Sequence, residues 1–325
     1  MNILKRADLS NSLKSNVMMV VPSLALIILG ELLIFFEALN TGIILHIINL
    51  NALIFLMIAM RNEDESVPKR RLSADREKIY EKIDSLVPLG RSDETTDLIE
   101  SAAVINDNLK KLKEEEDFGF DSDRIRKQLI QSLMLLLQLR IINVAMPIFF
   151  TITLYWYPLI YSPLFISIYI LIRNQGITLE DIGLTTRYIF LYIPAAVLIG
   201  FIMALVEYQI IDPPSLLMNP SIANITVLFI IMFVFVGLIE EIIFRSILMT
   251  RFEEAIGIWQ GLILSSILFG IMHSGYGTIY EIIFTMIVGL ILGYLFQRTR
   301  SLPLIVTIHG TINVFIFGFI HYLPV

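Results

Sequence analysis

Long apolar stretches separated by short polar breaks cover most of the 325-residue chain. A helix needs about 20 apolar residues to cross a bilayer, and most of these stretches reach or approach that length. Proline or glycine marks several of the breaks, including Pro158, Gly176 and Pro213-Pro214. The pattern predicts an all-α polytopic transmembrane bundle of about eight or nine spans, of which the fourth is the shortest. The expected spans are 17–38, 42–60, 133–154, 159–172, 188–211, 222–248, 256–273, 278–297 and 303–322.

Residues 61–132 interrupt the apolar pattern and hold 14 of the 24 Lys and Arg and 18 of the 30 Asp and Glu. Apolar residues at helical spacing over 72–87 and 93–117 predict a small helical hairpin with a short coiled-coil seam. We therefore expect three parts, an N-terminal transmembrane hairpin (1–60), this charged insert (61–132) and a membrane core (133–325). The insert either packs on itself or docks a protein partner, and its pattern does not indicate nucleic-acid binding.

Composition and charge agree with this class. The chain is 56% apolar with a mean hydropathy of +0.76, which is typical of an integral, multi-pass membrane protein surrounded by lipid. It has no cysteine, which excludes disulfides and thiolate sites. If the amino terminus is cytosolic, the basic residues, Arg140 and Arg245 included, fall in cytosolic segments or at cytosolic helix ends. The turns near 39–41, 155–162, 212–221 and 274–277 contain no Lys or Arg. The positive-inside rule thus predicts a cytosolic amino terminus and a cytosolic insert.

Three charged residues lie in the apolar run 222–248, namely Glu240, Glu241 and Arg245. A charged side chain near the centre of a spanning helix costs roughly 2.5–3.5 kcal/mol, so such groups indicate a site. Glu241 and Arg245 are four residues apart and can form an ion pair within the helix. Glu240 is turned about 100° away from them and has no local partner.

Two later spans repeat the pattern of polar residues at helical spacing. Phe269 and His273 share one face, as do His309 and Asn313. We expect Glu240, both histidines and Asn313 to surround one polar cavity in the bilayer that opens toward the cytosol. Four further ionisable residues in or beside apolar stretches are expected to be structural or interfacial, and they are Glu31, Glu37, His46 and His321.

These four side chains suit the hydrolysis of a carbonyl compound. A carboxylate and an imidazole around one water molecule form a general-base site. A second imidazole and a carboxamide can donate hydrogen bonds to a developing oxyanion. The alternative is a divalent metal such as zinc held by Glu240, His273 and His309, with water at an open position. The residues alone do not decide between no cofactor and zinc.

The motifs Glu240-Glu241-x-x-x-Arg245, Phe269-x-x-x-His273 and His309-x-x-x-Asn313, in this order, resemble those of the CAAX protease and bacteriocin-processing (CPBP) family. This intramembrane protease family includes Rce1-type prenyl proteases and "abortive infection" proteins. The resemblance covers roughly 133–322. It implies that Glu240 and His273 activate water and that His309 and Asn313 stabilise the oxyanion. It also implies that Glu241 and Arg245 hold the helix geometry and that Phe269 packs beside the site.

The resemblance implies an endopeptidase, either metal-dependent or glutamate-dependent. Its substrates would be membrane-associated peptides or lipid-modified tails, prenylated CAAX-type tails among them, reaching the cavity from the cytosol or from lipid. Two other readings remain open. One is a non-catalytic scaffold or bacteriocin-immunity-type protein that acts through the insert. The other is an ion or proton transporter with Glu240 as the relay, against which the lack of evident inverted repeats counts.

Overall fold

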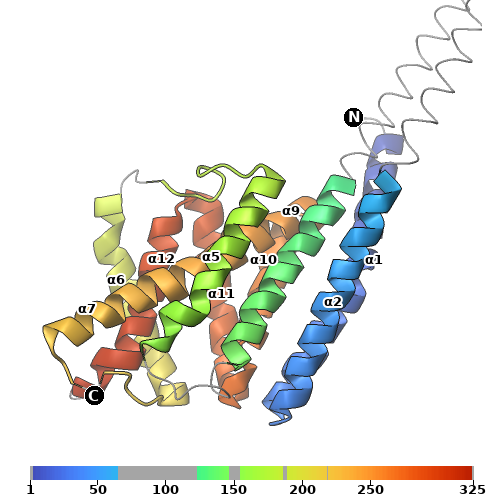
Figure 1. Cartoon of the computed structure of the whole chain (residues 1–325). Helices are drawn as coiled ribbons and strands as arrows, with labels where there is room; N and C mark the ends of the chain where they lie inside the picture. Colours follow the sequence, from blue (N-terminus) through green and yellow to red (C-terminus); the bar gives the residue numbers. More distant parts are fainter. Residues whose placement is uncertain (1–2, 65–122, 146–153, 186–188, 218, 324–325) are drawn as a thin grey trace, which may run out of the picture. The chain divides into compact units, whose positions relative to one another are not determined.

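The structure, a computed structural model, describes residues 3–64, 123–145, 154–185, 189–217 and 219–323 (Figure 1). Contacts between residues divide the chain into two compact units, residues 1–53 with 128–325, and residues 54–127. Most of the second unit, including the helices expected over 72–87 and 93–117, lies outside the described residues. The account below therefore concerns the first unit.

The described residues form helices and turns without a strand, and nine helical segments are long and apolar enough to cross a membrane. This confirms the predicted all-α polytopic class. Large apolar side chains are exposed on the outer surfaces of these helices, for example Ile44, Leu198 and Ile287. Such surfaces are stable in contact with lipid. The protein is an integral, multi-pass membrane protein.

The N-terminal helices are α1 (Ile3–Phe35) and α2 (Leu39–Asp64), followed by an unlabelled helix over Asp123–Ala145. Next come α5 (Trp156–Gln175) and α6 (Ile189–Ile211). The sixth span, Ile222–Ile256, joins α7 (Ile222–Ile230), η1 (Ile231–Leu238), α8 (Ile239–Glu241), η2 (Ile242–Met249) and α9 (Thr250–Ile256). The last elements are α10 (Ile258–Ile271), the turn η3 (Ser274–Tyr276), α11 (Ile279–Thr299), α12 (Leu302–Val314), η4 (Phe315–Phe319) and η5 (Ile320–Tyr322).

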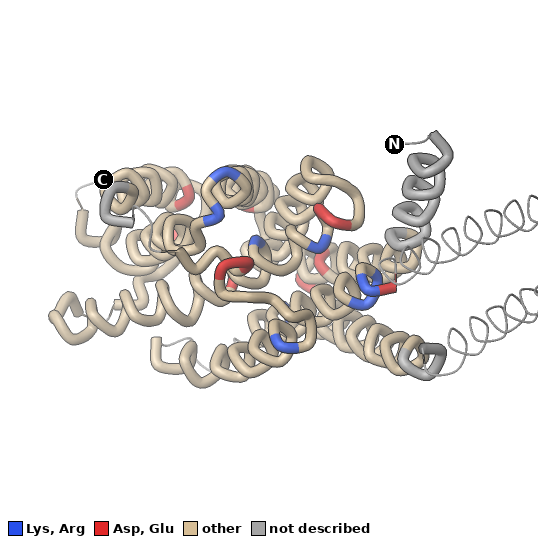
Figure 2. The backbone as a smooth tube through the Cα atoms, turned by 90° about the horizontal axis from the view of Figure 1, so that it is seen from above, with Lys and Arg blue, Asp and Glu red and all other residues tan. Residues whose placement is uncertain are grey.

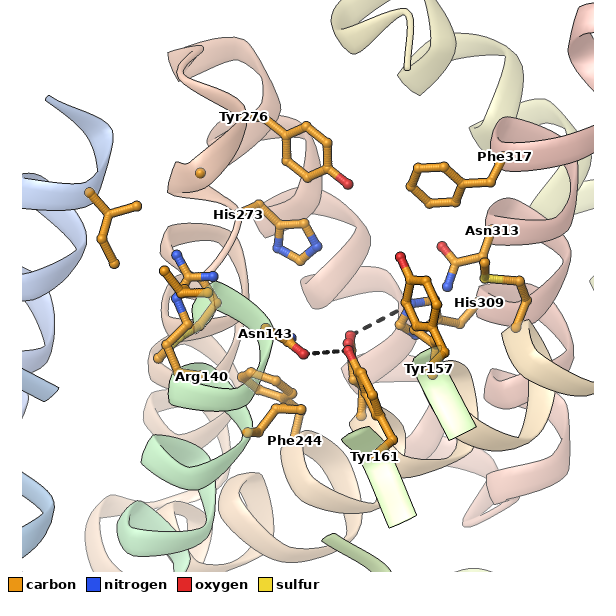
Figure 3. Close-up of a pocket in the computed structure, with 18 of the residues that line it drawn as sticks. Arg140, Asn143, Tyr157, Tyr161, Phe244, His273, Tyr276, His309, Asn313 and Phe317 are labelled. Carbon is orange, nitrogen blue, oxygen red and sulfur yellow. Dashed lines mark hydrogen bonds and ion pairs between the residues drawn. The ribbon is translucent and has the colours of Figure 1, made fainter. Parts of the chain in front are cut away.

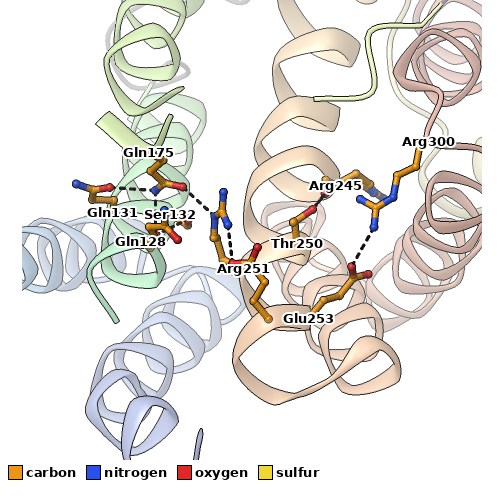
Figure 4. A network of polar contacts seen from close by, with 10 residues as sticks. Gln128, Gln131, Ser132, Gln175, Arg245, Thr250, Arg251, Glu253 and Arg300 are labelled. Atoms are coloured by element: carbon orange, nitrogen blue, oxygen red, sulfur yellow. Dashed lines mark hydrogen bonds and ion pairs between the residues drawn. The ribbon is translucent and has the colours of Figure 1, made fainter. Parts of the chain in front are cut away.

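The sequence placed some helix ends too early or too late, and polar contacts explain why. The third span starts at Asp123 and the fourth covers 20 residues. Gln175, at the end of α5, donates to the Gln128 carbonyl oxygen at 3.2 Å and to the Gln131 side chain at 3.0 Å (Figure 4). Arg251 Nε donates to Gln175 Oε1 at 2.9 Å, so the sixth span also continues past its expected end at residue 248. Helices extend through these polar residues because each finds a partner.

Helix α12 lies at the centre of the unit, against α6, α11 and the sixth span. Glycines allow the closest approach. A Cβ at Gly237 would lie 3.5 Å from the Gly310 backbone nitrogen, and a Cβ at Gly310 would lie 2.8 Å from the Phe233 ring. Because both residues lack a side chain, the sixth span and α12 cross with little separation. Glu240 and His309, one turn or less from this crossing, are thereby brought near each other.

Candidate active site

One cavity of about 400 Å³ is lined by all four of the side chains expected to meet, Glu240, His273, His309 and Asn313. In Figure 3 the labelled imidazoles and the Asn313 carboxamide point into the same space. The sixth span, the turn after α10, and α12 each contribute to it. The turn η3 also contributes Tyr276. Other lining residues come from the helix Asp123–Ala145, α5 and α6, and they include Arg140, Asn143, Tyr157, Tyr161 and Glu207.

Glu241 links the sixth span to α12. Its Oε1 lies 2.6 Å from His309 Nδ1 and accepts a hydrogen bond from Arg245 Nη1 at 3.0 Å. A carboxylate only accepts, so His309 Nδ1 carries the proton in this contact. His309 Nε2 lies 3.9 Å from Glu240 Oε2. Both glutamates thus approach His309, but Glu241 is buried in an ion pair with Arg245, whereas Glu240 lines the cavity.

Phe269 fills the space between the charged and imidazole groups. Its ring lies 4.2 Å from the Arg245 guanidinium carbon, and the ring centroids of His273 and His309 are 5.0 and 5.9 Å away. The Phe244 ring packs against it edge to face at 4.9 Å. Phe269 thus fixes the positions of both histidines by packing, and the cation–π contact helps to hold Arg245.

His273 lies just beyond the end of α10, not on the helix as expected. Its Nδ1 is 2.9 Å from the Phe269 carbonyl oxygen. A carbonyl oxygen only accepts, so Nδ1 is the donor, and in the neutral ring Nε2 is then an acceptor. Ser274 cannot serve as a nucleophile for His273, because its hydroxyl donates to Glu31 Oε2 at 2.5 Å.

Sequence reasoning missed the residues that line the other wall. Asn143 Oδ1 accepts a hydrogen bond from Tyr161 (Figure 3). Asn143 also interacts with Glu240. Arg140 and Asn143 are three residues apart and both line the cavity. The other motifs were recognised as polar residues at helical spacing in an apolar span. Arg140 and Asn143 follow the same pattern, so the sequence could have indicated them too.

A second buried cluster ties α1 to the core next to the cavity. Arg140 donates from Nε to Glu31 Oε1 at 2.6 Å and from Nη2 to Glu31 Oε2 at 2.5 Å. His46 Nε2 lies 2.9 Å from Glu31 Oε1, at a point where the missing side chain of Gly30 leaves room for the ring. Glu31 and His46 are both buried. The sequence predicted that Arg140 lies at a cytosolic helix end. The structure instead buries Arg140 in this cluster.

The cavity lies toward one end of the helices. Its lining residues come from the last turns of α1, the helix Asp123–Ala145 and α6, and from the first turns of α2 and α5. The turn after α10 adds His273 and Tyr276. Arg173, Arg251 and Arg298 lie at the opposite ends of their spans. The sequence predicted both a cavity open toward the cytosol and an arginine-rich end in the cytosol. These two predictions conflict, because the cavity and the arginines lie at opposite ends of the spans.

The alternative of a zinc site is not supported by the positions of these side chains. No group of three or more His, Cys, Asp or Glu residues in the described ranges is arranged to hold a metal ion. His309 Nδ1 contacts Glu241 and His273 Nδ1 contacts a backbone carbonyl, so each ring keeps one nitrogen for the cavity.

Residues 222–315 match one family model, described as type II CAAX prenyl endopeptidase Rce1-like. This Rce1-like segment covers less than a third of the chain. The match confirms the family resemblance predicted from the three motifs. No curated protein and no solved structure matches the chain.

The Rce1-like segment contains all three motifs, from Glu240 to Asn313. At the level of the family, it supports a CAAX-type intramembrane protease. The cavity wall that carries Arg140, Asn143 and Tyr161 lies outside the matched segment, and so do Glu31 and His46. These parts of the site belong to this chain's own N-terminal half.

Proposed function

We propose that this protein is an intramembrane endopeptidase that hydrolyses a peptide bond of a membrane-associated polypeptide with a water molecule activated by Glu240 and His273. The observation that carries the proposal is the convergence of Glu240, His273, His309 and Asn313 on one cavity. Buried polar groups that only hold helices together need no such space around them. A cavity of about 400 Å³ has room for a peptide segment and a water molecule.

Proton transfer is assigned to Glu240 and His273. His273 presents Nε2 to the cavity as an acceptor, because its Nδ1–H is held by the Phe269 carbonyl. Glu240 is the carboxylate that lines the cavity, whereas Glu241 is held by Arg245 and His309. Either group can take a proton from water in the attack on the carbonyl carbon, and the protonated group can return it to the leaving amine.

The oxyanion is assigned to His309 and Asn313. Asn313 directs its carboxamide into the cavity, where its N–H groups can donate (Figure 3). His309 donates from Nδ1 to Glu241, and in its protonated form Nε2 is a second donor, which is the form this role requires. Donors held in place before the reaction stabilise the charge that develops in the transition state.

The test uses the purified full chain in detergent or proteoliposomes with a pool of fluorogenic transmembrane peptides. Glu240→Gln and His273→Ala should each lower kcat/KM by about 10²-fold or more, the usual scale for one acid–base or oxyanion group. Glu180→Gln is the matched control, since this glutamate is exposed in the loop after α5. If wild type cleaves nothing, or if both variants cleave as well as wild type, the protease hypothesis fails and the non-catalytic scaffold is the better interpretation. Cleavage before and after chelator treatment tests the metal alternative in the same assay.

A further inference from the structure

The two ends of the membrane unit differ in charge. One end carries Arg173, Arg251, Arg298 and Arg300 on the last turns of spans or just after them. The turns at the other end, 36–38, 212–221 and 274–278, contain no Lys or Arg. Figure 2 shows that the basic positions are spread over several helices, so the bias does not come from one element. Such a bias sets the orientation of a membrane protein, with the basic end in the cytosol.

The cavity belongs to the end without basic turns. Tyr157 and Tyr276, which line it, come from the first turn of α5 and from the turn after α10, and Tyr276 is 44% exposed. Tyrosine is enriched at membrane–water interfaces. The cavity thus begins near an interface and continues inward to Glu240 and Phe244 in the middle of the sixth span. Leu39, the first residue of α2, marks the same end.

Arg140 does not alter this charge balance. It lies near the cavity end of its helix, but both carboxylate oxygens of Glu31 accept hydrogen bonds from it. The pair is buried and carries no net charge. Arg140 is the single Lys or Arg among the described residues that line the cavity. A substrate that ends inside the cavity would therefore have to place its terminal carboxylate beside Glu240 and Glu207, where the guanidinium is already paired and only a protonated histidine could offer a positive charge.

From these observations we infer that the cavity opens on the extracytosolic face of the membrane and receives internal segments of extracytosolic or membrane-embedded polypeptides, not the carboxyl-terminal ends of prenylated cytosolic tails. The inference rests on the proposed function for its substrate but not for its sidedness. The cavity reaches the surface beside Tyr157 and Tyr276, and the charged helix ends lie at the other interface. Glu240 is therefore more accessible from one face of the membrane than from the other.

Sidedness can be measured without cleavage, because the chain has no cysteine of its own. Gly275 lines the cavity, and a Cβ there meets no atom within 4 Å, so Gly275→Cys fits without strain. Glu180→Cys, in the exposed loop between α5 and α6, is the control for the arginine-rich face. Intact cells that carry either variant in the plasma membrane are treated with a membrane-impermeant maleimide before and after permeabilisation. Labelling after denaturation verifies that each thiol is present.

The inference requires Gly275→Cys to react in intact cells and Glu180→Cys to react only once the cells are permeabilised. The opposite pattern, or a Gly275→Cys thiol that stays unlabelled until permeabilisation or denaturation, overturns it. A pair of single-span reporters then presents one peptide sequence on either face of the membrane. Loss of cleavage when the sequence is moved to the cytosolic face supports the substrate class, and equal cleavage on both faces refutes it. If neither reporter is cut, the protease proposal fails while the maleimide result still measures the sidedness.

Discussion

Two buried polar clusters lie side by side in this molecule and use the same kinds of residue differently. In the Glu31 cluster, both carboxylate oxygens are bound to Arg140, and Ser274 and His46 close the group. In the Glu240 cluster, the carboxylate lies 3.9 Å from its nearest cationic candidate and faces a cavity. Both carboxylate oxygens of the first cluster have partners within that cluster. The Glu240 carboxylate of the second cluster faces open space, which is what a site for water and substrate requires.

The comparison shows that a charged residue in an apolar span does not by itself indicate a functional site. Glu31 and Glu240 are both buried glutamates in predicted spans. Their partners decide the outcome, because a fully paired carboxylate has no remaining capacity for chemistry, whereas an incompletely paired carboxylate beside a cavity does. The two clusters should therefore respond to mutation in opposite ways.

The largest effect on stability is expected in the Glu31 cluster. Arg140→Met leaves Glu31 without its bidentate partner, and breaking a buried ion pair from one side costs about 3–5 kcal/mol. Thermal unfolding of the purified protein in mild detergent measures the loss. The double variant Glu31→Leu with Arg140→Leu removes both charges and should recover much of it. A double variant that is less stable than Arg140→Met would show that the pair itself, and not the uncompensated charge, holds α1 in place.

The Glu240 cluster should lose activity without losing stability. Glu240→Gln removes the carboxylate and is expected to lower peptide cleavage by about 10²-fold, since one acid–base group is lost. Because functional sites are rarely optimised for stability, its melting temperature should equal or exceed that of wild type. A clear fall in melting temperature together with unchanged cleavage would assign Glu240 to the structural kind of cluster.

A third buried cluster, a pair of carboxyl groups, sharpens the comparison further. Glu281 on α11 is fully buried, its oxygens have no donor among the described residues, and it interacts with Glu207 of α6 at the cavity wall. Two carboxylates are both acceptors, so they can bond only through a shared proton. Glu281→Gln supplies an amide donor and should stabilise the protein by about 1 kcal/mol, the usual value of one hydrogen bond. Glu281→Leu is the comparison variant, and equal stability of the two would show that the donor is not what matters.

The smallest effect is expected outside the membrane, in the loop between α5 and α6. Asp181 accepts hydrogen bonds from the Thr178 backbone N–H at 2.8 Å and from its hydroxyl at 2.7 Å. The backbone hydrogen bond lowers the pKa of Asp181 below its ordinary 3.8. The folded state therefore gains from this charge at pH values above 3.8, and the gain disappears as the pH falls through the lowered pKa. Because the residue is exposed, Asp181→Asn should change stability at neutral pH by no more than about 0.5 kcal/mol.

Thermal unfolding of that variant at pH 7 and at pH 3 is the check. The difference from wild type should shrink at the lower pH. A loss that grows on acidification would mean that another group, and not Asp181, is responsible.

The sequence by itself determined the number and approximate position of the spans, and the three motifs of the Rce1-like segment. It could do so because the bilayer imposes a length and an apolar composition on each span, and because charges inside a span are too costly to occur by chance. Glu240, His273, His309 and Asn313 were all identified in this way, and His273 differed only in lying on the turn after α10.

Only the tertiary structure decided which buried charges are paired and where the cavity lies. Glu31 and Arg140 are 109 positions apart, and no local pattern shows that they meet. The crossing at Gly237 and Gly310, which brings Glu241 to His309, also depends on the packing of two helices distant in sequence. Periodicity reports the face of one helix, whereas pairing and open space depend on which faces of several helices come together.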